Sequence, residues 1–324
     1  MKRKTKMFRI LGIIIAILLL TAVIIIFALI INHKSKLKKE SEEYPPIGSI
    51  VEVNDKKLHV YTAGDGDITL VFMAGHGTNC PALDFKPLWI RLTDEYRIAV
   101  IEKAGYGWSE TSNSPKDLDT ILEETRKAIE LSGEKAPYVL FPHSMSGLEA
   151  VYWAQKYPDE VKAIIGLDPC TPETIDLLPE PQKLQLQFMY FISRIGLSRL
   201  MPESQVGENL PLMKSNELSE EDKDQYIAVF YKSAFTKDML REASCLKKNA
   251  AIVAKNDVPI DTPMYFFISE GQEAIANGWK KALSDYVYII DIGKYMYLDI
   301  GHYVHYDKAD IIAEETKAFL AEIE

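Results

Sequence analysis

Cysteine is scarce in this sequence: Cys80, Cys170 and Cys245 stand far apart in a chain of 324 residues. The odd number and the long spacings exclude a disulfide scaffold and any C-x-x-C zinc or redox site. Acidic residues are missing from positions 1–39, which hold nine Lys and Arg, whereas the rest carries 28 Lys and Arg against 47 Asp and Glu. A body this acidic repels phosphate backbones, so we expect no nucleic acid partner.

Cofactor motifs are also missing. Gly105-Tyr-Gly has no third glycine and no helix at the spacing that a dinucleotide site needs. His302 and His305 stand close together, but the further ligands of a metal site do not accompany them. We therefore expect no cofactor and no metal.

A long apolar run is present near the N-terminus. Residues 8–31 contain one charge, Arg9, and no proline. About 20 apolar residues cross the hydrocarbon core as a helix, whereas a cleaved signal peptide has a shorter apolar region and a small-x-small site. The run also lacks the polar face of a core helix. We expect a basic flank at 1–7 and a single uncleaved transmembrane helix at 8–31.

Basic residues flank the uncharged part of this run on both sides, five up to and including Arg9 and four after Ile31. The positive-inside rule then favours a cytoplasmic N-terminus by a margin of one residue. The body would lie outside the cytoplasm, anchored in the cell membrane. Residues 32–46, with Lys/Glu clusters and Pro45-Pro46, are expected to form a solvated tether.

Short apolar runs alternate with amphipathic stretches through the rest of the chain. Such runs are typical of strands buried on both faces of a parallel sheet. Two short strands at 49–53 and 58–63 are followed by the runs at 68–74, 97–101, 138–141, 161–167, 264–268 and 287–292. Helical patterns occupy 117–131, 148–156 and 309–323. The alternation predicts an α/β fold, a mostly parallel sheet with helices on both faces.

Residues 171–256 interrupt this alternation. Helical patterns at 183–195, 220–234 and 237–254 occur there without a good strand. About 85 residues are too many for a simple crossover, so we expect an inserted helical cap. The predicted core is then formed by 47–170 and 257–324.

Ser144 stands between an apolar strand and the start of a helix. A serine at so sharp a turn has a strained backbone and an exposed hydroxyl above the sheet. The positions two residues to either side must be small, and here they are Pro142 and Ser146. The helix N-terminus directs N–H groups at the site, which suits a developing oxyanion. An ordinary helix N-cap serine is the alternative interpretation.

This turn resembles that of the α/β-hydrolase superfamily, usually G-H-S-M-G-G, although Pro142-His-Ser-Met-Ser-Gly replaces both outer glycines. The stretch M-A-G-H-G-T-N at 73–79 is similar to the superfamily's His-Gly loop. The stretch at 98–109 resembles D-R-x-G-x-G-x-S, with Glu102 and Lys103 in place of Asp-Arg. The resemblance implies an α/β-hydrolase with an inserted cap.

The resemblance also implies site residues. Ser144 would be the nucleophile, and the backbone N–H groups of Thr78 and Met145 would form the oxyanion hole. His76 is expected to be structural. His302, in the stretch D-I-G-H-Y-V-H before the last helix, matches the catalytic histidine, with His305 as the fallback.

The acid of the triad is the least determined member. Gln272 occupies the position where the superfamily commonly has aspartate, and Glu270 and Glu273 are displaced from that register. Some haloalkane dehalogenases place the acid at the end of the preceding strand, where this chain has Asp168. A turn cap beside Pro169 is the structural alternative. We expect Asp168, with Glu270 or Glu273 as alternative acids.

A serine nucleophile argues for acyl transfer, since an aspartate would have implied dehalogenase or epoxide chemistry. We expect a membrane-anchored serine hydrolase for a small-molecule or lipid-like ester or amide, acting through an acyl-enzyme. A proline iminopeptidase-like aminopeptidase is one alternative; it would need cap acids for the substrate amine, such as Glu203, Glu208 or Glu220-Glu221-Asp222. A non-catalytic receptor on the same fold is the other.

Overall fold

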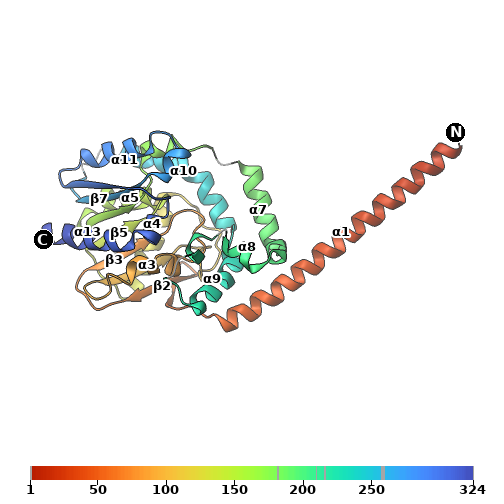
Figure 1. The fold of residues 1–324 in the computed structure, drawn as a ribbon, viewed down its shortest axis with the longest axis horizontal. Coiled ribbons are helices and arrows are strands. Elements are labelled where there is room, and N and C mark those ends of the chain that lie inside the picture. Colours follow the sequence, from red (N-terminus) through yellow and green to blue (C-terminus); the bar gives the residue numbers. More distant parts are fainter. Residues whose placement is uncertain (1, 181, 209, 215–216, 257–259, 324) are drawn as a thin grey trace.

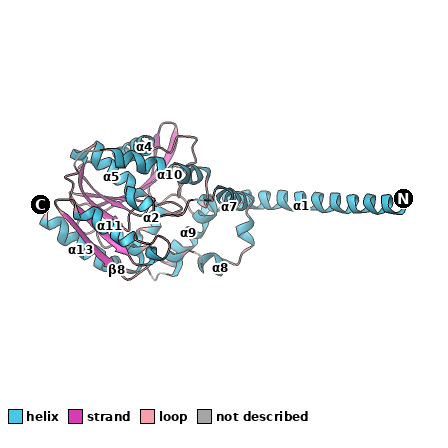
Figure 2. Cartoon of the chain, turned by 90° about the horizontal axis from the view of Figure 1, so that it is seen from above, coloured by secondary structure: helices cyan, strands magenta, loops and turns pink. Residues whose placement is uncertain are grey.

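The computed structural model describes residues 2–180, 182–208, 210–214, 217–256 and 260–323 (Figure 1). A single long helix, α1 (Lys2–Glu43), projects from a body that holds the rest of the chain. Viewed from above, the N-terminal part of α1 stands clear of the body (Figure 2). The helix is long and apolar enough to cross a membrane, judged by its length and composition.

The body is built on an eight-stranded sheet of order β1-β2-β4-β3-β5-β6-β7-β8. The strands are β1 (Ser49–Val53), β2 (Lys56–Ala63), β3 (Thr69–Met73), β4 (Arg97–Glu102), β5 (Tyr138–Pro142), β6 (Val161–Leu167), β7 (Met264–Ser269) and β8 (Gly293–Leu298). β2 pairs antiparallel with β1 and β4, and all other neighbours are parallel. The carboxyl ends of the parallel strands therefore meet along one edge of the sheet, where α/β proteins place their sites.

Local sequence explains the start of this sheet. Asn54 and Asp55 have φ of 50° and 59°, and Val53 pairs directly with Lys56. A two-residue hairpin turn needs positive φ at both central positions, which Asn and Asp tolerate. By contrast, every residue of β3, β5 and β7 is buried, as the apolar runs predict.

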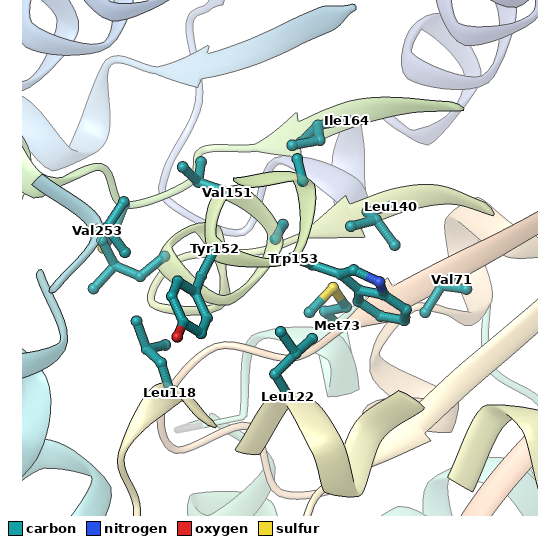
Figure 3. Packing of buried hydrophobic residues seen from close by; sticks show 14 of the residues in the cluster. Val71, Met73, Leu118, Leu122, Leu140, Val151, Tyr152, Trp153, Ile164 and Val253 are labelled. Atoms are coloured by element: carbon teal, nitrogen blue, oxygen red, sulfur yellow. The ribbon is translucent and has the colours of Figure 1, made fainter. Parts of the chain in front are cut away.

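Helices cover both faces of the sheet. α4 (Leu118–Leu131), α5 (Ser146–Lys156) and α11 (Trp279–Tyr288) contribute to one buried cluster, part of which is drawn in Figure 3. α3 (Lys86–Trp89) and α13 (Ala309–Glu322) contribute to the cluster on the other face. The shorter elements of the core are α2 (Pro81–Asp84), η1 (Pro158–Glu160), η4 (Gly271–Ala274) and α12 (Val304–Asp307).

The segment between β6 and β7 is helical and contains no strand among its described residues. Its elements are α6 (Pro172–Ile175), α7 (Lys183–Ile195), η2 (Leu197–Leu200), α8 (Glu203–Glu208), η3 (Pro211–Lys214), α9 (Glu220–Ser233) and α10 (Lys237–Lys255). Buried ion pairs join it to the core: Lys103 pairs with Glu242, and Lys116 with Asp238 at 2.9 Å. Charges buried as pairs hold the helices in one place on the sheet, because separating them leaves each unpaired.

The predicted strand at 287–292 is wrong. α11 continues to Tyr288, and the last strand begins only at Gly293. Val287 and Leu283 are one helical turn apart and both are fully buried, so the apolar residues belong to a helix face. β8 is an edge strand with exposed tyrosines, Tyr295 and Tyr297, and therefore lacks the continuous apolar run of a central strand.

The expected tether also differs from what is found, since α1 continues without a break to Glu43. His33, Leu37 and Glu40 follow each other at helical spacing and turn toward the body. His33 is buried, Leu37 packs on a buried cluster, and Glu40 accepts hydrogen bonds of 2.6 Å from two nitrogens of Arg199. One helix face with partners in the body explains why this polar stretch is ordered.

Trp153 tests the packing of the main cluster. It is fully buried between α4 and the sheet, and its ring N–H donates to Glu160 at 2.8 Å. We expect Trp153→Ala to lower the free energy of unfolding by about 3–5 kcal/mol because it leaves a large cavity. Denaturant titration of the detergent-solubilised protein measures this. Leu131→Ala, at an exposed position, should change it by at most about 0.5 kcal/mol, and equal effects would contradict the packing described.

Candidate functional site

Ser144 occupies a strained turn between β5 and α5. Its φ is +56°, a left-handed conformation that non-glycine residues rarely adopt. The neighbouring Ser146 is fully buried, and its hydroxyl lies 2.7 Å from the Met73 carbonyl and 2.9 Å from that of His143. The departure from glycine at position 146 is thus accommodated by hydrogen bonds to two carbonyls.

The loop after β3 packs directly on this turn. A β-carbon on Gly75 would lie 2.6 Å from the Ser144 β-carbon and 2.9 Å from the His143 carbonyl oxygen. Only glycine allows this approach. The close packing fixes the loop that carries Thr78 beside the candidate nucleophile.

The two predicted oxyanion donors follow the two residues of this contact in the chain, Thr78 three residues after Gly75 and Met145 directly after Ser144. Thr78 is buried in the loop, and Met145 occupies the N-cap of the eleven-residue helix α5. Within the described part of the chain, neither backbone N–H donates a hydrogen bond, and the buried Thr78 hydroxyl also lacks a partner. Buried polar groups normally find partners, so these groups are suited to receive a ligand oxygen.

Asp168 and His302 are brought together from opposite ends of the C-terminal half. The Nδ1–H of His302 donates to Asp168 Oδ2 at 2.6 Å. Asp168 is fully buried directly after β6, and the His302 side chain retains 20% of its exposure. A short bond to a carboxylate fixes the imidazole tautomer with Nε2 as the free acceptor.

Two further side chains hold the Asp168 carboxylate. Ser269 donates through its backbone N–H at 2.9 Å and its hydroxyl at 2.6 Å, and the Trp279 ring N–H donates at 2.9 Å. Sequence reasoning did not single out either residue. Ser269 is a polar residue at the end of an apolar strand, which is a usable signal, whereas nothing local marks Trp279.

His143 connects the serine turn to the His302 loop. Its Nε2 lies 3.1 Å from the His302 carbonyl oxygen, and the two rings are 4.7 Å apart. A carbonyl only accepts, so Nε2–H is the donor. Burial, together with the nearby His302 and His305, lowers the pKa of His143 well below its usual value, which keeps the ring neutral. His143 was predicted only as part of the motif, without this role.

The alternative acids, Glu270 and Glu273, have partners other than His302. Glu270 is paired with Lys280 at 2.8 Å, and Glu273 accepts from the backbone N–H groups of Gly278 at 2.6 Å and Lys280 at 3.0 Å. These backbone donors lower the pKa of Glu273, whose carboxylate therefore serves the start of α11. Nδ1 of His302 bonds to Asp168 and not to either glutamate.

Of the remaining histidines of the motifs, His305 is buried and His76 is partly buried. His305 is fully enclosed, its two ring nitrogens have no partner among the described residues, and it packs on Phe85 and His143. Burial and then His302 lower its pKa to about 3. His76 has a buried Nδ1 without a partner, and its pKa is lowered chiefly by burial. His305 therefore packs as a neutral ring.

Cys170 is a neighbour of the serine that the sequence did not reveal. Its backbone N–H donates to the Ser144 carbonyl at 2.7 Å, and its thiol contacts the Ser144 hydroxyl. Burial raises the pKa of this thiol to about 12. The thiol is therefore neutral and a poor nucleophile, unlike a catalytic cysteine.

Glu102 and Lys103, which replace the familiar Asp-Arg pair, are both buried. Glu102 lies 3.0 Å from His59 Nδ1 and accepts from the Trp108 backbone N–H at 2.7 Å. Lys103 donates to Glu149 of α5 at 2.6 Å and also to Glu242 of α10. Lys103 thus joins α5 to α10. No group of three metal-ligating side chains occurs among the residues described.

Comparisons with known proteins identify the family of this chain. A family model for the alpha/beta hydrolase fold matches residues 79–195. The Bacillus subtilis protein YbdG is 38% identical over 266 residues, which are 82% of this chain and 80% of that protein. The chain belongs to the α/β-hydrolase superfamily. It is also similar to 2-(acetamidomethylene)succinate hydrolase of Mesorhizobium japonicum, 26% identical over 118 residues, 36% of this chain and 41% of that protein.

Solved α/β-hydrolases have the same fold. An epoxide hydrolase from Vigna radiata superimposes with a TM-score of 0.66 over 85% of this chain and 97% of its own, at 19% identity. The predicted superfamily and fold class are therefore confirmed, and at this level the chain is a hydrolase of the α/β-hydrolase superfamily. A likeness at 19% identity shows that the fold is shared but does not identify the substrate.

The enclosed His305 makes stability depend on pH. Its pKa is about 3 in the folded chain and about 6.5 when unfolded, so the unfolded state binds the proton first as the pH falls. Stability from this residue is complete above pH 6.5 and declines toward pH 3, by up to about 1.4 kcal/mol per pH unit. His305→Phe should reduce the slope of unfolding free energy between pH 6 and 4 by about that amount.

Denaturant titrations of the full chain in detergent at pH 6, 5 and 4 measure this slope. Tyr303→Phe is the matched control because Tyr303 lies in the same aromatic group but has a pKa of about 12. The control should keep the wild-type slope. Equal slopes in wild type and His305→Phe would contradict a neutral, buried His305.

Proposed function

We propose that the chain is a membrane-anchored serine hydrolase that cleaves an ester or amide of a small or lipid-like molecule. The observation that carries the proposal is the 2.6 Å hydrogen bond from His302 to the buried Asp168, on a loop whose His302 carbonyl lies 3.1 Å from His143, the residue before the left-handed Ser144. An imidazole oriented by a buried carboxylate is the general base that a serine nucleophile needs.

In the first half-reaction, Ser144 Oγ attacks the substrate carbonyl carbon as its proton passes to His302 Nε2. The carbonyl oxygen becomes an oxyanion, which the N–H groups of Thr78 and Met145 stabilise. His302 then gives the proton to the leaving alcohol or amine, and the carbon–leaving group bond breaks. Asp168 keeps the hydrogen bond from His302 Nδ1 and stabilises the imidazolium.

Water completes the cycle. It attacks the acyl-enzyme carbonyl while His302 takes its proton, and collapse of the second oxyanion returns the proton to Ser144 and releases the acid. A serine here, in place of the aspartate of dehalogenase and epoxide chemistry, is why we propose acyl transfer. Each oxyanion donor contributes on the order of 3 kcal/mol to such barriers.

Two alternative hypotheses, an aminopeptidase and a non-catalytic receptor, compete with the serine hydrolase. An aminopeptidase would need acidic side chains for a substrate amine, but Asp222 pairs with Lys86 at 2.6 Å and caps α9. The side chains of Glu203 and Glu208 lie outside the described residues. A non-catalytic receptor would share the fold but not react, which the labelling experiment below decides.

The proposal also assigns a role to each segment of the chain. Residues 8–31 would cross the membrane after the basic flank 1–7, and the linking segment 32–46 would lead to the core of 47–170 and 257–324 with its cap of 171–256. The long apolar helix supports an anchor. The excess of basic residues before the run supports a body outside the cytoplasm.

Covalent labelling tests the nucleophile. A fluorophosphonate should label the wild-type chain once, and Ser144→Ala should abolish labelling because the attacking oxygen is gone. Mass spectrometry of the labelled peptide identifies the residue. Ser132→Ala, which removes a hydroxyl at the end of α4, should label like wild type. A folded wild-type chain that never labels would support the receptor reading instead.

Charge removal tests the acid. Asp168→Asn should lower kcat for an activated ester by a factor on the order of 10⁴, because the neutral amide favours the wrong His302 tautomer. Steady-state kinetics measure this. Glu270→Gln and Glu273→Gln are the controls, and each should stay within about threefold of wild type. The reverse ranking would transfer the role to a glutamate.

A further inference from the structure

α7 leaves one face of large apolar side chains exposed. Leu184, Phe188 and Phe191 follow each other at helical spacing and retain 81%, 58% and 48% of their exposure. We call these three residues the α7 apolar face. The opposite side of the helix packs on the body, where the buried Ser193 donates to the Ala234 carbonyl at 2.7 Å. Apolar residues gathered on the outside of one helix mark an interaction surface.

The end of α7 is attached to α1 immediately after the apolar run. Gly196, which ends α7 with φ of +73°, lies so close to α1 that a β-carbon on it would be 2.5 Å from the His33 β-carbon. His33 is two residues beyond Ile31, the last residue of the run. The C-terminal end of α7 is therefore level with the end of the predicted membrane span.

The last residues of the apolar run are less exposed on the face of α1 that is turned toward the body. Ile26, Leu29 and Ile30 are half-buried, on the same helix face as His33, whereas residues 6–25 are exposed. α1 contacts α7 and α9. Both views show α7 beside α1 where the latter leaves the body (Figures 1 and 2). The C-terminal end of α7 thus lies against α1 near the end of the apolar run.

Arg199 of η2 holds this arrangement. Its guanidinium donates to His33 Nδ1 at 2.8 Å and to both Glu40 oxygens at 2.6 Å, and it lies 4.1 Å from the centre of the Tyr231 ring. The Arg199 side chain is only 4% exposed. A bidentate, enclosed arginine fixes α7 and η2 relative to α1.

We propose that the α7 apolar face lies in the interfacial layer of the same bilayer that α1 crosses. The proposal rests on the membrane anchor of the proposed function. A helix with an apolar face at the level of a span end fits the headgroup–acyl boundary. The lysines that follow the run, Lys34, Lys36, Lys38 and Lys39, would meet anionic headgroups at that level.

Site-directed spin labelling of the full chain tests this in vesicles of phosphatidylglycerol and phosphatidylethanolamine. Cys245→Ser gives the background, since Cys80 and Cys170 are buried. Single cysteines are introduced as Leu184→Cys and Phe188→Cys and labelled with a nitroxide. The ratio of collisions with oxygen to collisions with a water-soluble nickel complex reports depth.

Two matched positions calibrate the measurement. Leu20→Cys, in the middle of the run, should give the high ratio of the bilayer core, and Tyr288→Cys, exposed on α11, the low ratio of water. Labels at 184 and 188 should give a ratio at least threefold above that at 288. A low ratio at 184 and 188 with a high ratio at 20 overturns this inference but leaves the anchor intact.

The other possible outcomes of the spin-label experiment also decide whether the α7 apolar face contacts lipid. Labels at 184 and 188 that are shielded from both reagents would mean a protein contact, such as a second copy, and would overturn a lipid surface. A low ratio at 20 would remove the anchor and this inference with it. Neither outcome bears on the Ser144 chemistry, which fluorophosphonate labelling reads separately.

Discussion

The hydrogen bond between Asp168 and His302 is the contact on which the organisation of the site depends. It joins the end of β6 to the loop before α12, so both ends of the cap insertion must return to the sheet for it to form. Ser269 and Trp279 point their donors at the same carboxylate. Donors on both oxygens hold the carboxylate in one position, which is what an imidazole needs to keep one orientation.

A second constraint is backbone crowding at the serine turn. The left-handed φ of Ser144 is tolerated because the loop at Gly75, the Ser146 hydroxyl and the Cys170 N–H all contact the turn. Strain of this kind persists only where the surroundings impose it. Replacing the usual glycines by proline and serine keeps the turn because both fit the strand end and the helix start.

Much of the fold follows from the sequence because the buried strands are continuous apolar runs. The edge strand β8 was misplaced since exposure on its outer side removes that signal, and the apolar residues before it serve α11. Ser144, Asp168 and His302 could be proposed because the stretches around them resemble motifs of the superfamily. Trp279 and Arg199 could not, because their roles depend on partners more than a hundred residues away. The helical segment 32–43 was missed for the same reason.

The unbroken course of α1 has a mechanical consequence. α1 runs without a break through the apolar run to Glu43, and Arg199 of η2 binds Glu40 in its final turns. Because this helix has no break, any tilt that it takes in the proposed membrane anchor would be passed on to the whole body. Membrane thickness would then influence how the body is oriented relative to the membrane surface.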